Sequence, residues 1–255
     1  MGDVVGLLHP GEMGAAIGAV LRRQGVEVLW ASSDRSDATA GRAESAGLTD
    51  AGTVAALARS AGVILSVCPP HAARDVAAAV GGFEGVYVDA NAVAPATVRE
   101  ISQAFGRFVD GGIVGPPPAA DSPTHLYLSG AEPERVATLF DGTPVVARVV
   151  SERVGDASAV KAAYAAWTKG SAALLLAIRG VARAEGVEEA LLAEWRESIP
   201  DLPERLWRAQ RSAEAKGWRW VGEMEEIAAA FAAAGEPGGF HLAAAEVFRR
   251  YERLF

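Results

Sequence analysis

Hydrophobic positions over residues 4–149 follow two different spacings. Continuous apolar runs of four to seven residues are typical of buried strands, whereas apolar positions three or four residues apart are typical of helices. Such runs, together with shorter apolar-rich stretches, predict strands at 4–8, 27–31, 63–67, 85–89, 108–111, 124–129 and 145–149, and the helical spacing predicts helices at 13–24, 53–60, 71–80 and 95–104. Strands that alternate with helices in this way predict a doubly wound α/β domain, a parallel sheet covered by helices on both faces.

The pattern changes near residue 150. From Gly155 to about Ala184 the chain keeps helical spacing without a strand signal, and three or four further helices follow, separated by glycines and prolines. We therefore predict a dinucleotide-binding (Rossmann) domain over residues 1–150 and an all-helical domain over 151–255, which we expect to bind substrate and to dimerise. A helix of about thirty residues exceeds the usual globular length, so we expect it to join the two domains.

Composition narrows the classes of function. The chain has 255 residues, half of them hydrophobic, and a formal net charge of −8, which argues against nucleic acid as a partner. One cysteine, Cys68, excludes an internal disulfide and favours a reducing compartment. The N-terminus lacks the features of a signal peptide, and charged residues interrupt the longest apolar stretch. We expect a cytoplasmic protein without a membrane partner and without a metal site.

The stretch GLLHPGEMG, residues 6–14, is one letter away from the dinucleotide-binding pattern G-x-G-x-x-G. Gly11 and Gly14 stand in the second and third glycine positions, which serve approach to the pyrophosphate and helix–strand packing. His9 stands in the first position, and because it precedes Pro10 we expect its backbone to be extended. The predicted cofactor-binding residues of this turn are His9, Pro10, Gly11, Glu12, Met13 and Gly14. A strand–helix turn without a ligand is the alternative.

The second predicted strand ends in LWASSDRS, residues 29–36. An NAD site usually places an acidic residue there for the ribose hydroxyls. Ser32, Ser33 and Arg35 suit a 2′-phosphate instead, because arginine offers a planar fork of donors. We therefore favour NADP over NAD, although Asp34 could serve a ribose and Arg35 could be a solvated loop charge.

Two further segments offer polar groups at strand ends. The carboxamide of Asn91 can hydrogen-bond a substrate, a nicotinamide or a catalytic lysine, but asparagine is equally suited to a turn. Gly111 and Gly112, followed by Ile113, permit close backbone approach to a substrate, or they form a rigid turn. These residues are the candidates on the substrate side of the first domain.

The long helix carries a polar stripe in an alanine- and leucine-rich stretch. Helical spacing brings together Ser158, Lys161, Thr168, and Tyr164 or Ala165. A lysine with a lowered pKa can exchange a proton during hydride transfer, and we expect burial and Lys169 to lower that of Lys161. The alternative is a solvated Lys161.

The last helices contain a second group of candidates. His241 follows a Gly-Gly turn, where a helix dipole disfavours its protonated form, and we include it in the substrate site. Trp218, Trp220 and Phe240 either line a pocket or serve packing.

Five segments, in this order, resemble the β-hydroxyacid dehydrogenase and 6-phosphogluconate dehydrogenase superfamily. They are GLLHPGEMG, VILSVCPP, YVDANAVAPATV, FVDGGIVGPPP and GDASAVKAAYAAWTKGSAAL. More closely, the chain is similar to bacterial 6-phosphogluconate dehydrogenase-like oxidoreductases of unassigned substrate. The resemblance implies a Rossmann domain, a helical domain, a homodimer, and hydride transfer between a nicotinamide and a small substrate.

The resemblance also assigns residues. It places Cys68, Pro69 and Pro70 over the adenosine side of the cofactor, Asn91 beside the nicotinamide, residues 111–113 in a glycine-rich substrate loop, and Lys161 on the family's catalytic lysine. The family often has asparagine where this chain has Ala165, which puts the usual hydroxyacid substrates in doubt. Imine reductases, a sister group, generally replace the lysine.

These observations leave three functions open. The first is an NADP-dependent oxidoreductase acting on a small carbonyl or alcohol, with Lys161 as general acid and base. The second is an NADPH-dependent reductase of C=N bonds. The third is a regulatory protein that binds the cofactor without turnover, which His9 and Ala165 keep open.

Overall fold

The computed structural model describes residues 4–251 and divides into two compact units, Met1–Lys161 and Ala162–Phe255. The division falls inside a single long helix, α7 (Asp156–Ala184). Residues 1–3 and 252–255, which belong to the two predicted domains, lie outside the described part. Each unit is described by itself.

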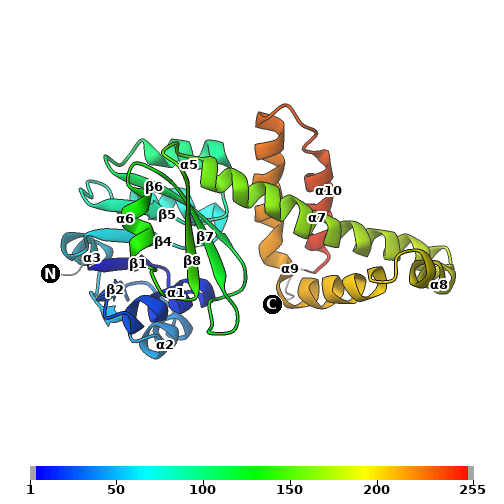
Figure 1. The fold of residues 1–255 in the computed structure, drawn as a ribbon, viewed down its shortest axis with the longest axis horizontal. Helices are drawn as coiled ribbons and strands as arrows, with labels where there is room; N and C mark the ends of the chain where they lie inside the picture. The colour runs from blue at the N-terminus through cyan, green and yellow to red at the C-terminus, as the bar shows by residue number, and fades with distance from the viewer. Residues whose placement is uncertain (1–3, 252–255) are drawn as a thin grey trace. The chain divides into compact units, whose positions relative to one another are not determined.

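The first unit is built on one eight-stranded sheet with the order β3-β2-β1-β4-β5-β6-β7-β8 (Figure 1). The strands are β1 (Val5–Leu8), β2 (Val28–Trp30), β3 (Thr49–Asp50), β4 (Val63–Ser66), β5 (Val86–Asp89), β6 (Phe108–Val114), β7 (Thr124–Gly130) and β8 (Val145–Ser151). All neighbours are parallel except β6 and β7, which are antiparallel. The carboxyl ends of β1, β2, β4 and β5 therefore meet at one edge of the sheet.

The β6–β7 pair departs from the predicted parallel arrangement. We expected a strand that ends at Gly111 and a glycine loop after it, and this is wrong: Gly111 and Gly112 lie within β6, in register with Leu128 and Tyr127 of β7. Residues 115–123 join the two strands, and such a connection is too short for the crossover that parallel pairing requires. The antiparallel neighbour extends β6 through both glycines.

Helices flank this sheet. They are α1 (Glu12–Arg23), α2 (Asp37–Ser45), α3 (Val54–Ser60), the 3-10 turn η1 (Pro70–Ala72), α4 (Ala73–Ala78), α5 (Pro95–Ser102) and α6 (Pro133–Thr138). Sequence analysis missed α2, α6 and β3. Helix α2 buries Ala43 alone and so has no apolar stripe to detect, but the hydroxyl of Ser36 caps it by accepting from the Thr39 amide.

Side chains of the central strands alternate between two apolar clusters, one on each face of the sheet. Val63 and Leu65 of β4 belong to one cluster, and Ile64 belongs to the other together with Tyr87 of β5. Tyr87 stacks on Phe105 with ring centroids 4.1 Å apart. This alternation confirms that helices cover both faces of the sheet.

The second unit is all-helical. It comprises most of α7 together with α8 (Glu188–Ser198), α9 (Leu202–Ala233) and α10 (Gly239–Arg249). Helices α9 and α10 pack closely, with Met224 and Phe248 fully buried and Trp220 edge-on to Phe248 at 4.9 Å. Among the described helices, none combines the length and apolar character needed to cross a membrane.

Candidate functional site

The turn between β1 and α1 keeps the geometry of the glycine pattern. His9 has a φ of +65°, so the predicted extended backbone at this residue is wrong. The turn requires the left-handed conformation that glycine usually supplies there, and this requirement overrides the preference imposed by Pro10. The Gly11 amide donates to the His9 carbonyl at 2.7 Å, and a Cβ on Gly14 would lie 2.8 Å from the same oxygen. Gly14 is therefore needed where it stands.

The open side of the turn is suited to a phosphate. A Cβ built on Gly11 would meet no atom within 4 Å, and Gly11, as the N-cap of α1, supplies no side chain to the first turn. Backbone amides at a helix N-terminus attract anions, and the helix dipole strengthens that attraction. Met13 packs against the core of the sheet, whereas Glu12 is exposed.

Two arginines from the segment after β2 reach this turn. Arg35 contacts the imidazole Nε2 of His9, and Arg42 of α2 donates from Nε to the Pro10 carbonyl at 3.2 Å. Arg42 escaped sequence analysis because the helix that carries it was missed. The signal available in the sequence was a second basic residue shortly after Ser32 and Ser33.

The His9–Arg35 contact is half-buried. Burial and the Arg35 charge lower the pKa of His9 to about 4, so the imidazole is neutral at neutral pH. Within the described residues, His9 Nδ1 and Arg35 Nε are buried atoms without a hydrogen-bond partner. These two atoms fit a polar ligand at the turn.

The predicted serines are held by the loop after β3. The Ser32 amide donates to the Asp50 carboxylate at 3.2 Å, and the Ser33 hydroxyl donates to the Gly52 carbonyl at 2.8 Å. Asp34 has a φ of +60°, so the chain turns sharply before Arg35. The structure therefore brings Arg35 to the glycine turn while the serines shape the loop that carries it.

Asn91 and Cys68 meet at the ends of β4 and β5. The buried Asn91 carboxamide donates to the Ser66 hydroxyl at 3.0 Å and accepts from the Cys68 amide at 2.6 Å. These bonds fix the segment that continues into Pro69 and Pro70. Burial raises the pKa of the Cys68 thiol to about 12, so the thiol is neutral.

A buried acid that sequence analysis missed lies beside this pair. Asp89 ends β5 and accepts from the Asn91 amide at 3.0 Å, and burial raises the pKa of Asp89 to about 7. Its Oδ2 atom is buried without a partner among the residues described. An acidic residue in an otherwise apolar strand was the signal available in the sequence.

A second buried acid, Asp110 of β6, accepts hydrogen bonds from the first turn of α7. Its Oδ1 atom accepts from the Ser158 hydroxyl at 2.6 Å, and Oδ2 accepts from the amides of Gly155 and Ser158 at 3.0 Å each. Ser129 of β7 also donates to Oδ2 and accepts from the Ala157 amide. Burial raises the pKa of Asp110, while these hydrogen bonds oppose the shift.

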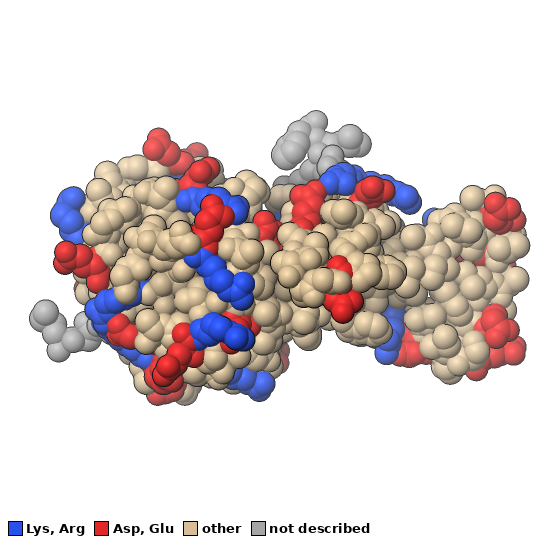
Figure 2. Space-filling model, turned by 90° about the horizontal axis from the view of Figure 1, so that it is seen from above, with Lys and Arg blue, Asp and Glu red and all other residues tan. Residues whose placement is uncertain are grey.

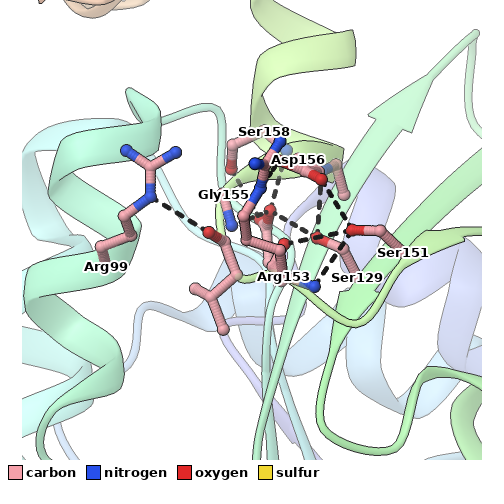
Figure 3. A network of polar contacts seen from close by, with 10 residues as sticks. Arg99, Ser129, Ser151, Arg153, Gly155, Asp156 and Ser158 are labelled. Carbon is pink, nitrogen blue, oxygen red and sulfur yellow. Dashed lines mark hydrogen bonds and ion pairs between the residues drawn. The ribbon is translucent and has the colours of Figure 1, made fainter.

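Gly155 begins this turn under the side chain of Arg99. Its φ is +101°, and a Cβ there would lie 2.8 Å from the Arg99 guanidinium, which donates to the Val154 carbonyl (Figure 3). Glycine is therefore required at this position.

The Cβ atom of Lys161 lies close to Gly112, one of the two glycines of β6. A Cβ on Gly112 would lie 2.6 Å from the Ala157 carbonyl and 3.2 Å from the Lys161 Cβ. A Cβ on Gly111 would meet Ala90 at 3.1 Å. The two glycines thus serve close approach by the protein's own elements, and of the candidate residues 111–113 the structure brings Gly112 to Lys161.

The other predicted residues of α7 lie in the helical unit. Tyr164 and Thr168 are exposed, and the Thr168 hydroxyl donates to the Tyr164 carbonyl at 3.2 Å. Lys169 forms an ion pair with Glu223 of α9.

His241 lies in the first turn of α10 and is 6% exposed. Its ring meets Phe231 edge-on at 4.2 Å, and a Cβ on Gly170 would lie 3.8 Å from it. The pKa of His241 is lowered, as expected, but the cause is burial and not the helix dipole. Phe240 beside it is 76% exposed. Over residues 4–251, no group of three or more His, Cys, Asp or Glu residues is arranged to hold a metal ion.

Comparison with known proteins places this geometry among dehydrogenase-like folds. Residues 182–251 match the family model "Domain of unknown function (DUF1932)". An uncharacterized 28.5 kDa protein in the 7S RNA 5′ region of Methanothermus fervidus is 29% identical over 192 residues, which are 74% of each protein.

Solved structures cover nearly the whole chain. The conserved protein MTH1747, of unknown function and described as similar to 3-hydroxyacid dehydrogenases, is 28% identical with a TM-score of 0.73 over 97% of this chain and 96% of that one. Mycobacterium tuberculosis 3-hydroxyisobutyrate dehydrogenase with L-serine is 16% identical, with a TM-score of 0.72 over 98% and 94%. A reductive aminase from Aspergillus terreus in complex with NADPH is 19% identical, with a TM-score of 0.61 over 98% and 93%. These likenesses confirm the predicted fold class.

Proposed function

We propose that this chain, whose fold is similar to that of 3-hydroxyacid dehydrogenases, is an NADP-dependent oxidoreductase. In the proposed reaction, hydride passes between the nicotinamide and the carbonyl or alcohol carbon of a small substrate, and Lys161 exchanges the proton. The β1–α1 turn carries the proposal, because it keeps the glycine-pattern geometry around a side chain that replaces the first glycine.

The residues at the carboxyl edge of the sheet fit a dinucleotide. The first-turn amides of α1 would hold the pyrophosphate, and Arg35 on the loop shaped by Ser32 and Ser33 would hold the 2′-phosphate. Asn91 fixes the segment containing Pro69 and Pro70, which would line the cofactor. The bound cofactor supplies a hydride donor or acceptor. The reductive aminase of similar fold, whose structure is a complex with NADPH, supports NADP.

Lys161 would complete the reaction on the substrate side. Hydride arrival at a carbonyl carbon leaves an alkoxide oxygen, which takes a proton from the lysine Nζ; in the reverse direction the same nitrogen accepts the hydroxyl proton. Gly112 of β6 lies against the first turns of α7, close to the Lys161 Cβ. Tyr164, Thr168 and His241 of the helical unit would contribute to substrate choice.

Reduction of a C=N bond is the second candidate. Ala165, which is 3% exposed, replaces the asparagine expected from the family resemblance, and so removes an amide that would orient a hydroxyacid. The likeness to a reductive aminase adds support. Substrate tests must therefore include imines.

We also propose a cytoplasmic homodimer. Trp167, Leu174 and Val181 are 69%, 61% and 65% exposed and are spaced by seven residues on α7, so they share one face of the helix. Figure 2 shows broad uncharged areas over the helical unit. An apolar stripe of this kind favours burial against a second copy.

Cofactor binding and turnover test the function separately. Calorimetric titration of the full chain with NADPH and NADH is expected to show binding of both, with NADPH tighter. Turnover is then measured with ketones, 2- and 3-hydroxyacids and cyclic imines. Absence of binding to either dinucleotide would overturn the proposal, and tight binding without turnover of any class would favour the regulatory alternative.

A further inference from the structure

The residue in the first glycine position of the turn is a histidine held in a conformation that favours glycine. His9 has a φ of +65° on a backbone whose hydrogen bond to Gly11 closes the turn. Glycine would adopt this φ without steric cost. The backbone gives no reason for a histidine at this position, so the reason lies in the contacts of its side chain.

Its partner comes from 26 residues further along the chain. The imidazole Nε2 of His9 contacts the guanidinium of Arg35. Arginine has only donors, so Nε2 must accept, and the remaining ring proton belongs to Nδ1. The low pKa of His9, about 4, keeps the ring in this neutral form. The imidazole is thus an acceptor that fixes one end of the Arg35 fork.

The pair is left with two buried donors. His9 Nδ1 and Arg35 Nε are both buried without a partner among the described residues, and both carry a proton in this arrangement. An unpaired donor on the Arg35 cation, beside a second unpaired donor on the neutral imidazole of His9, calls for an anionic acceptor, because a buried donor without a partner is costly. The loop after β2, which carries Arg35, is where a dinucleotide's ribose is read.

We propose that His9 is a positioning residue that fixes Arg35 for the 2′-phosphate and so sets the preference for NADP over NAD. This inference rests on the proposed function and adds the residue through which discrimination acts. In this chain the first glycine is exchanged for a side chain that reads the cofactor indirectly, through the arginine.

Adenine nucleotides that differ by one phosphate test the inference without catalysis. The full chain, wild type and variants, is titrated calorimetrically with 2′,5′-ADP and 5′-AMP. His9→Gly, which suits the positive φ, is expected to lower the affinity for 2′,5′-ADP about tenfold and to leave 5′-AMP within about twofold. Arg35→Ala is expected to lower the 2′,5′-ADP affinity by about ten- to a hundredfold.

The double variant His9→Gly/Arg35→Ala tests whether His9 acts through Arg35. If His9 acts through Arg35, His9→Gly adds less than about twofold in the Arg35→Ala background. Arg23→Ala, which removes an exposed charge from the same unit, is the matched control and is expected to leave the ratio of the two affinities unchanged. Thermal unfolding of His9→Gly at or above the wild-type temperature shows that the fold is intact.

Each other outcome overturns the inference. An unchanged affinity ratio in His9→Gly, or additive losses in the double variant, removes the positioning role while the oxidoreductase proposal stands. Failure of the wild type to bind either probe, NADPH or NADH removes both proposals together.

Discussion

The Ser158 hydroxyl donates to the Asp110 carboxylate at 2.6 Å, three residues before Lys161 on the same helix. The bond joins β6 to the first turn of α7, and the same carboxylate accepts from the amides of Gly155 and Ser158. Asp110 therefore fixes the position of the first turn of α7, the helix that carries the lysine proposed for proton transfer.

Asp110→Asn is expected to destabilise the protein by roughly 2–4 kcal/mol, because an amide group cannot accept from the donors that the second carboxylate oxygen now satisfies. Urea unfolding of the variant and the wild type measures the loss. Asp156→Asn, which alters an acid in the same turn that pairs with exposed Arg153, is the control and should cost less than about 1 kcal/mol. Equal losses in the two variants would contradict the anchoring role.

Asp89 and His9 give opposite pH dependences of stability. The folded-state pKa of Asp89 is raised to about 7, so its contribution is present at acidic pH and is lost as the pH rises from about 4 to about 7. The folded-state pKa of His9 is lowered from 6.5 to about 4, so its contribution grows with pH over nearly the same window. The two slopes offset one another in the wild type.

Asp89→Asn removes the Asp89 contribution, so the rise of unfolding free energy with pH that His9 causes is expected to become visible. Relative to the wild type, the variant should gain unfolding free energy as the pH rises from 4 to 8, by a few kcal/mol at most. Urea unfolding at four pH values in this range measures the difference. A pH-independent difference would contradict the assignment.

Two glycines of the first turn should respond differently to alanine. Gly14→Ala places a Cβ 2.8 Å from the His9 carbonyl, and we expect a lower unfolding temperature together with weaker NADPH binding. Gly11→Ala meets no protein atom within 4 Å, so it should fold normally and lose NADPH affinity because its methyl group faces the phosphate side. Thermal unfolding and calorimetry separate the two effects; unchanged NADPH affinity in Gly11→Ala counts against the site.

Lys161→Ala is expected to lower turnover by about two to four powers of ten on a substrate identified as above, because it removes the proton donor. NADPH affinity should stay within about twofold. Lys161→Arg should not restore the rate, since a guanidinium does not release its proton near neutral pH. Lys216→Ala, at an exposed position of α9, is the control. Near-normal turnover in Lys161→Ala would transfer the role to Tyr164 or His241 and favour C=N reduction.

Leu174→Glu tests the proposed dimer. A charge in the exposed apolar stripe of α7 should shift the protein from dimer to monomer in light scattering at micromolar concentration, while far-ultraviolet circular dichroism stays unchanged. Glu226→Lys on α9 is a charge-changing control. A wild-type monomer at that concentration would remove the proposal.

The alternation of apolar runs and helical spacing sufficed for the fold class, because central strands such as β4 bury both faces and show unbroken apolar sequence. It failed at α2, whose single buried residue leaves no stripe, and at β6, whose glycines looked like a loop. Local pattern predicted β7 as a strand but did not show that it pairs antiparallel with β6.

The spacing of Gly11 and Gly14 correctly located the β1–α1 turn, and their contact with a cofactor stays a prediction. The approach of Arg35 to His9 depends on tertiary contact, and the left-handed His9 reverses a local preference set by Pro10. Asp89 and Asp110 could not be distinguished from surface acids by residue type. Their roles follow from burial.

Burial of Cys68 determines how its thiol reacts with oxidants. This is the sole cysteine of the sequence, and a thiol pKa of about 12 leaves about one molecule in 100,000 as the reactive anion at pH 7. That anion is the form of a cysteine that attacks peroxides and disulfides. A protein proposed to carry reducing equivalents thus keeps its own sulfur out of redox exchange, and its activity should not follow the oxidation state of the medium through a thiol.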